Sequence, residues 1–189
     1  ANNSVTSEAA QNVAVMVDSF TTGNLEAAVT AKHANLDEIT SLTIKSGTVN
    51  KDDFAFMSGT VLGEGASAAT RYKPFYNAAS NNLPEDFVYL KNLKKIDLSG
   101  ADCENDMIPG RAFWGNTQIT SIILPKNVKR IGLAAFYGMT NLSYLSTDKS
   151  SNLYFDGVEI LGESMVGEDK ALEGDLHLPS SLKQIGASC

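Results

Sequence analysis

Residues 108–145 read IPGRAFWGNTQITSIILPKNVKRIGLAAFYGMTNLSYL, and the second part of this segment repeats the first. Five pairs of landmark residues are each separated by 23 positions. A fixed offset shared by several landmarks is typical of repeat architectures, in which each repeat is one supersecondary unit. The five pairs are Ile108 and Ile131, Phe113 and Phe136, Gly115 and Gly138, Ile119 and Leu142, and Ile122 and Leu145.

The repeat returns after an interruption. Leu124-Pro125 recurs as Leu178-Pro179, 54 residues later. Three further pairs have the same separation, and they are Val128 and Leu182, Ile131 and Ile185, and Gly132 and Gly186. The chain is therefore expected to resume the same structural unit near its last residues.

Each repeat contains a short strand motif, in which one residue separates two apolar residues and another apolar residue often precedes them by three positions. This L-x-x-L-x-L pattern is typical of leucine-rich repeats, whose strands stack into a parallel sheet. Phe113 and Phe136 are expected to fill the interior of successive coils. The five segments are Leu42-Thr43-Ile44, Ile96-Asp97-Leu98, Ile122-Ile123-Leu124, Leu145-Ser146-Thr147 and Leu176-His177-Leu178.

Residues 108–145 resemble the BspA-like leucine-rich repeats of bacterial surface proteins. Three features carry the resemblance: an A-F pair, an L-P step and an I-G step, as in Ala135-Phe136, Leu124-Pro125 and Ile131-Gly132. Asn116 and Met139 stand where the family has a cysteine. The resemblance implies export to the cell envelope or the exterior, and binding of protein or glycan.

These features predict an α/β repeat fold, a right-handed leucine-rich-repeat solenoid of parallel strands. Residues 1–36 are expected to form a small helical N-terminal cap, and residues 37–189 the solenoid. Two stretches outside the repeat, near 59–86 and 148–175, are expected to be insertions. In the second, residues 158–161 and 164–166 flank Gly162-Glu163, which suggests a hairpin turn.

The helical cap is predicted from apolar periodicity. One stripe at helical spacing is expected to cover the Leu42 end of the stack, and a second short helix could begin after Asn24. The first stripe consists of Val13, Met16, Val17 and Phe20, and the second of Leu25, Ala28 and Val29.

Composition and motifs argue against several function classes. A formal net charge of −7 disfavours nucleic acid and anionic lipid as partners. No stretch approaches the roughly 20 apolar residues of a membrane helix. Ser146-x-x-Lys149 and Ser180-x-x-Lys183 match a serine–lysine pattern without its companion motifs. We therefore expect no enzyme, no cofactor, no metal site and no membrane insertion. Trp114 remains open between stacking on a ligand and packing between coils.

The outward residues of the strands are the predicted ligand face, since solenoids commonly bind along such a concave sheet. A protein or carbohydrate ligand is expected, and the alternative is a structural spacer within a larger surface protein. A binder should expose Ile123 and Tyr144 together, whereas a spacer needs no such patch. The predicted binding residues are Ser41, Thr43, Lys95, Asp97, Ser121, Ile123, Tyr144, Ser146, Asp175 and His177.

The last residues predict an open end. Cys189 takes the repeat position of Ala135, one residue before the counterpart of Phe136. The expectation is a fragment of a longer repeat protein whose last coil leaves an apolar end and a strand edge open. Such an edge is a template for self-association.

Overall fold

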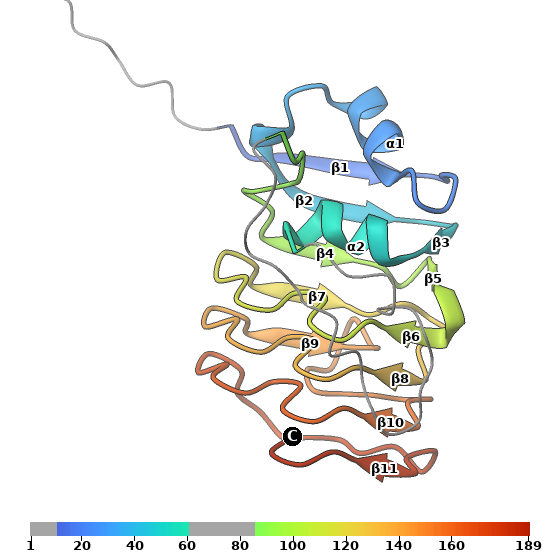
Figure 1. Ribbon diagram of the computed structural model, residues 1–189, viewed down its shortest axis with the longest axis vertical. Coiled ribbons are helices and arrows are strands. Elements are labelled where there is room, and N and C mark those ends of the chain that lie inside the picture. Colours follow the sequence, from blue (N-terminus) through green and yellow to red (C-terminus); the bar gives the residue numbers. More distant parts are fainter. Residues whose placement is uncertain (1–10, 61–85) are drawn as a thin grey trace, which may run out of the picture.

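The computed structural model describes residues 11–60 and 86–189, which form a stack of coils built around two parallel sheets (Figure 1). The first sheet has the order β1 (Val13–Val17), β2 (Ile39–Ile44), β4 (Lys95–Asp97), β7 (Ser121–Ile123) and β9 (Tyr144–Ser146). The second has the order β6 (Met107–Ile108), β8 (Arg130–Ile131), β10 (Ile160–Leu161) and β11 (Gln184–Ile185). Chain order and spatial order agree along both sheets.

A third sheet has two strands, β3 (Thr48–Val49) and β5 (Asp102–Cys103), which pair in parallel. The described helices are α1 (Leu25–Lys32) and α2 (Lys51–Ser58), with short 3-10 turns at Leu36–Glu38 and Glu104–Asp106. The predicted parallel pairing of the repeat strands is confirmed, because Ile96 lies beside Ile122 and Ile122 beside Leu145.

The core between the two sheets contains the aromatic residues expected from the repeat. Phe113 and Phe136 are fully buried, and their rings stack with centroids 5.8 Å apart. Phe54 of α2 meets Phe113 edge-on at the same distance, so the aromatic column continues into the N-terminal part. Edge-to-face and stacked rings both add to the free energy of burial.

The glycine of the I-G step has a packing role. A Cβ atom on Gly132 would lie 2.4 Å from the backbone nitrogen of Gly110 in the preceding coil. Cβ atoms on Gly162 and Gly186 would come equally close to the backbone of the coil before them, at 2.5 Å and 2.3 Å. Glycine at this step therefore lets neighbouring coils approach to backbone contact.

The prediction of a helix through residues 13–20 is wrong, because Val13–Val17 form strand β1. β1 pairs in parallel with β2, with Val15 beside Leu42. Val15 and Val17 are buried while Met16 between them is 49% exposed, which is the period of two of a strand. The β-branched valines favour the strand. The Leu42 end of the sheet is thus covered by a strand.

The second predicted helix is confirmed as α1, which buries Leu25 and Val29. A single carboxylate holds its start against α2. Asp53, 1% exposed, accepts hydrogen bonds from the N–H groups of Gly23 (2.8 Å), Leu25 (3.0 Å) and Asn50 (3.0 Å). Burial raises the pKa of Asp53 even though these three donors act to lower it.

The hairpin predicted across Gly162-Glu163 is wrong. Leu161 lies in parallel register between Ile131 and Ile185, so residues 158–166 belong to one more coil. The 54-residue offset is therefore two steps, of 30 and 24 residues, with Gly162 as the counterpart of Gly132. The other predicted insertion, near 59–86, lies almost entirely outside the described residues.

Candidate binding face

The outward residues of the first sheet stand in two columns across its strands. Strand pairing places Ser41 beside Lys95, Lys95 beside Ser121, and Ser121 beside Tyr144. The same pairing brings eight of the ten predicted binding residues onto one face of one sheet. The second column consists of Thr43, Asp97, Ile123 and Ser146.

Strand β1 extends both columns with residues that the helical interpretation missed. Ala14 lies beside Ser41, and Met16 lies beside Thr43. Met16, at 49% exposed, is the large apolar side chain that this part of the face presents to solvent. The sequence signal for this outward position is the spacing of Val13, Val15 and Val17 in VAVMV, in which every second residue points into the core.

A loop folds back over the C-terminal part of this face, and we call residues 147–152 the crossing loop. Lys149 in this loop forms an ion pair with Asp97 of β4, with Nζ 2.7 Å from Oδ2. β7 lies between β4 and β9, so Lys149 reaches across the Ile123 position. The Tyr144 hydroxyl donates to the carbonyl of Asp148 at 2.7 Å. The loop is therefore fastened to the face at more than one place.

Ser146 is a correction to the predicted site. Its side chain is fully buried, and its hydroxyl donates to the carbonyl oxygens of Ser151 (2.6 Å) and Tyr154 (3.0 Å). The crossing loop thus takes this residue away from any ligand. Ile123 and Tyr144 are both half-buried, so the exposed patch expected of a binder at these two residues is not observed, whereas Lys95 is exposed. The open part of the face lies over β1, β2 and β4.

The segment predicted as the last strand of this sheet is reduced to one bridge. His177 pairs with Tyr154 in parallel, and their rings lie 5.8 Å apart. The N–H of Thr147 donates to the carbonyl of Tyr154 at 2.8 Å, which links this pair to the end of β9. Asp175 and His177 are exposed, but they lie beyond the crossing loop, separated from the open part. Tyr154, 37% exposed, is a further outward residue that the sequence analysis missed.

Asp97 is held as a carboxylate by its surroundings. Burial alone would raise its pKa, but hydrogen bonds from Lys149 and Ser99 lower the pKa below its ordinary value. Ser99 donates to Oδ1 twice, from its N–H at 2.9 Å and its hydroxyl at 2.6 Å. The carboxylate is thus fully engaged within the protein.

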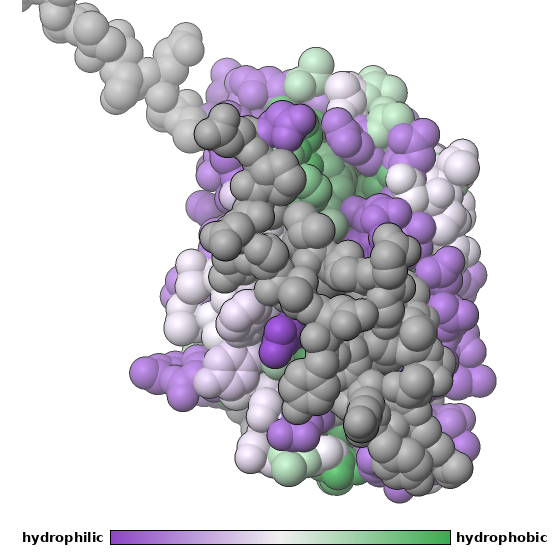
Figure 2. Space-filling model, in the orientation of Figure 1, coloured by the Kyte–Doolittle hydropathy of each residue, from purple (hydrophilic) through white to green (hydrophobic). Residues whose placement is uncertain are grey.

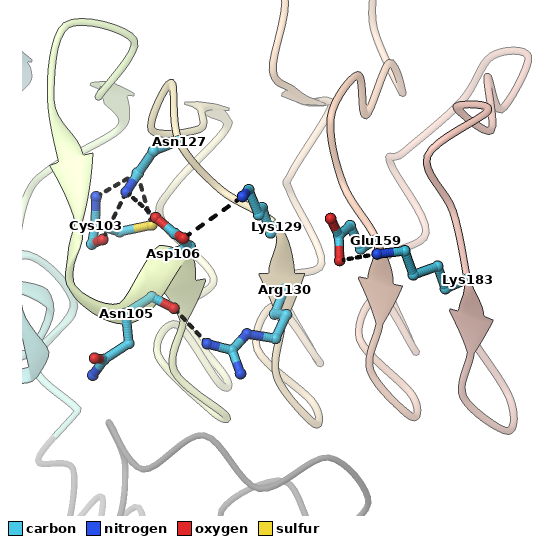
Figure 3. Close-up of polar contacts among 8 residues, drawn as sticks. All are labelled: Cys103, Asn105, Asp106, Asn127, Lys129, Arg130, Glu159 and Lys183. Carbon is cyan, nitrogen blue, oxygen red and sulfur yellow. Dashed lines mark hydrogen bonds and ion pairs between the residues drawn. The ribbon is translucent and has the colours of Figure 1, made fainter.

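The second sheet presents a different surface, a column of alternating charge on successive coils (Figure 3). Asp106, Lys129, Glu159 and Lys183 each precede a strand of this sheet. Lys129 lies 3.9 Å from Asp106, and Lys183 lies 2.8 Å from Glu159. The hydrogen bond from Lys183 lowers the pKa of Glu159. These charges pair with one another across the coils.

Cys103 lies on the same side of the stack, and its surroundings disfavour the reactive thiolate (Figure 3). Its thiol is 2% exposed and lies 3.2 Å from Oδ1 of Asn127. Burial, reinforced by the charge of Asp106, raises the pKa of Cys103 to about 12. A thiol with such a pKa is almost entirely protonated at neutral pH and is a poor nucleophile.

The first of the two serine–lysine patterns is engaged in structural contacts. Ser146 donates to backbone carbonyls and Lys149 pairs with Asp97, so these two residues form no nucleophile–base pair. Within residues 11–60 and 86–189, no group of three or more histidine, cysteine or acidic residues is placed to hold a metal ion. In the same ranges no helix is long and apolar enough to cross a bilayer.

Parallel strands stacked at this repeat, with an apolar pair in each coil, define a leucine-rich-repeat region. Residues 106–189 match the family model described as BspA type leucine rich repeat region, in six copies. This part of the chain is similar to that family, as the A-F, L-P and I-G features suggested. Comparison with curated proteins and with solved structures finds no match for the chain. Leucine-rich-repeat regions are generally non-catalytic modules, and those of the BspA type are typical of surface or secreted proteins.

Proposed function

We propose that this chain is a non-catalytic, extracellular binding module of a bacterial surface or secreted protein. The open part of the first sheet, over β1, β2 and β4, is the proposed ligand face for a protein or a glycan. Its outward side chains are Ala14, Met16, Ser41, Thr43 and Lys95. The match of residues 106–189 to the BspA-type family model supports the location and the absence of catalysis.

The observation that carries the proposal is the exposure of Met16 beside a flat row of small polar residues. An apolar side chain 49% exposed, with a lysine two strands away, offers an anchor and a charge for a partner. The small serine and threonine side chains leave room for a partner to approach the sheet.

A spacer role is the second candidate, and the alternating charges of the second sheet favour it for that side of the stack. Paired charges on successive coils hold the coils in register without needing a ligand. Both roles can exist in one chain, because the two sheets face opposite sides of the core.

A binding screen against host-matrix proteins and a glycan array tests the proposal. Met16→Ala and Lys95→Ala should each weaken binding of any hit by about 1 kcal/mol or more, as interface anchors do. Lys129→Ala, on the second sheet, is the matched control and should change little. Equal losses for all three variants would reject the face, and an absence of hits would favour the spacer.

A further inference from the structure

A second concave site lies away from the proposed ligand face, between the end of α2 and the turn that follows Phe113. It is a cavity of about 200 Å³. Within the part of the chain that the structure describes, every side chain that lines it is uncharged. The residues that matter for its chemistry are Ser58, Thr60, Tyr89, Trp114, Asn116 and Gln118.

Two aromatic rings line the cavity, and both are held in place. The Arg111 guanidinium lies 5.3 Å from the centre of the Trp114 ring. The Tyr89 ring packs directly on Gly59, where a Cβ atom would lie only 2.5 Å from the ring. Rings fixed in this way offer preformed apolar planes, since no side-chain ordering is required when a ligand packs on them.

Asn116 supplies an unused acceptor. This side chain is 5% exposed, and its Nδ2 donates to the carbonyl of Ser58 at 2.9 Å, which fixes the amide. Its Oδ1 is buried and has no hydrogen-bond partner among the described residues. A buried acceptor without a donor is unfavourable, so a hydroxyl group brought by a ligand would stabilise the bound state. The oxygen is not exposed to solvent, so a ligand reaches it only when the cavity wall moves.

The next coil shows that the stack does not need a polar group here. Asn116 and Trp114 correspond to Met139 and Tyr137, 23 residues later. Met139 is fully buried and packs against the core. One coil further on, Asp169 takes the same position and also has a buried oxygen without a partner, so a polar group at this position is not special to the cavity. What distinguishes the coil that borders the cavity is the combination of the Asn116 amide with the Trp114 indole.

We propose that this cavity binds one ring of a neutral sugar. Sugar rings have apolar C–H faces that pack on aromatic planes and hydroxyl groups that donate hydrogen bonds, which matches Trp114 and Tyr89 on one side and the Asn116 oxygen on the other. The described lining residues carry no charge that would pair with an acidic sugar, and the small volume selects a single ring. This site is independent of the proposed ligand face.

Trp114 is the single tryptophan of the chain, so its fluorescence reports this cavity alone. The purified chain is titrated with methyl glycosides of glucose, galactose, mannose and N-acetylglucosamine. At least one should produce a saturable change in Trp114 emission with a dissociation constant in the millimolar range or tighter. Glucuronic acid should bind more weakly.

Two variants locate the binding. Asn116→Met, which copies Met139, and Gln118→Ala should each weaken binding by about tenfold. Tyr137→Ala, the counterpart of Trp114 outside the cavity, is the control, and a melting curve shows that each variant is folded. Lys95→Ala should leave sugar binding unchanged, which separates this site from the ligand face. The inference is overturned if no glycoside saturates the signal, or if Asn116→Met and Gln118→Ala bind as tightly as the parent chain.

Discussion

Lys149 and Asp97 are joined across 52 residues of sequence by an ion pair of 2.7 Å that spans strand β7. The contact fastens the crossing loop onto the outer face of the first sheet. The ion pair therefore limits the part of the face that a ligand can reach. The strands before β7 remain accessible, whereas the crossing loop covers β9.

Removing this contact should free the loop without unfolding the chain. Lys149 is 60% exposed in the side chain, and exposed ion pairs contribute about 0–1 kcal/mol. For Lys149→Ala we expect faster amide hydrogen exchange in residues 147–152 and a change in the free energy of unfolding of less than about 1 kcal/mol. Lys183→Ala breaks an ion pair of the second sheet and is the control. Unchanged exchange in the loop would show that Tyr144 and Ser146 hold it alone.

The glycine step should tolerate no side chain. Gly132→Ala places a methyl group where the Gly110 backbone lies, 2.4 Å away, so the coils must separate. We expect a loss of about 2–4 kcal/mol in the free energy of unfolding, measured by urea denaturation. Gly157→Ala is the control, because its Cβ meets nothing within 4 Å and only its positive φ of 80° opposes the change. That variant should lose about 1–2 kcal/mol. Similar losses in both would contradict the packing argument.

The Asp169 carboxyl should make stability depend on pH. Burial raises its pKa from 3.8 to about 7, and hydrogen bonds from the Met139 and Gly138 N–H groups only partly oppose this. The folded chain keeps this proton after the unfolded chain has released it. The contribution of Asp169 to the free energy of unfolding therefore falls as pH rises from about 4 to about 7.

Asp169→Asn removes that dependence. Compared with the parent chain, the variant should gain on the order of 1 kcal/mol in the free energy of unfolding between about pH 5 and pH 8. Denaturation curves at several pH values measure the difference. If the two chains show parallel pH profiles, Asp169 is not the titrating group.

The last described coil should promote association between chains. Leu176, Leu178 and Ile185 are 52%, 49% and 51% exposed. Their counterparts in the repeat, Ile122, Leu124 and Ile131, are at most 1% exposed. Figure 2 shows hydrophobic surface at this end of the stack. Exposed apolar surface next to a strand edge favours pairing with another molecule.

Sedimentation at increasing protein concentration, under reducing conditions, tests this expectation. The parent chain should form larger species, and Leu178→Lys should lower their amount. Met16→Lys, an exposed apolar position at the other end of the first sheet, should leave them unchanged. A chain that sediments as a monomer throughout would contradict the prediction. A non-reducing gel then shows whether Cys189, which is exposed, links two chains.

The repeat pattern predicted the core of the molecule well, because the same residue types recur wherever coils stack. Phe113, Phe136 and the paired strands could be placed from spacing alone. Strand β1 could not, because VAVMV fits both a helical and an alternating period over so short a length. Pairing with β2 decides in favour of the strand.

Alternation along the strands predicted which residues form the candidate face, but the crossing loop covers part of that face. Alternation correctly placed Ser41, Lys95 and their neighbours on one side of the sheet. Ser146 is buried because the crossing loop covers it. Lys149 of this loop pairs with Asp97, and the carbonyl of Ser151 accepts a hydrogen bond from Ser146. These contacts leave no periodic pattern in the sequence. Long-range polar contacts of this kind depend on the folded geometry.

The carboxylate of Asp53 also limits how this protein can be re-engineered. It satisfies backbone donors at Gly23, Leu25 and Asn50, so the start of α1 depends on a side chain that belongs to α2. A chimera that joined β1 and α1 to the repeats of another protein would lose that acceptor and leave the N–H groups of Gly23 and Leu25 without this partner. The transferable building block is residues 13–58 as one piece, and a crossover placed between the two helices should yield an insoluble or partly unfolded product.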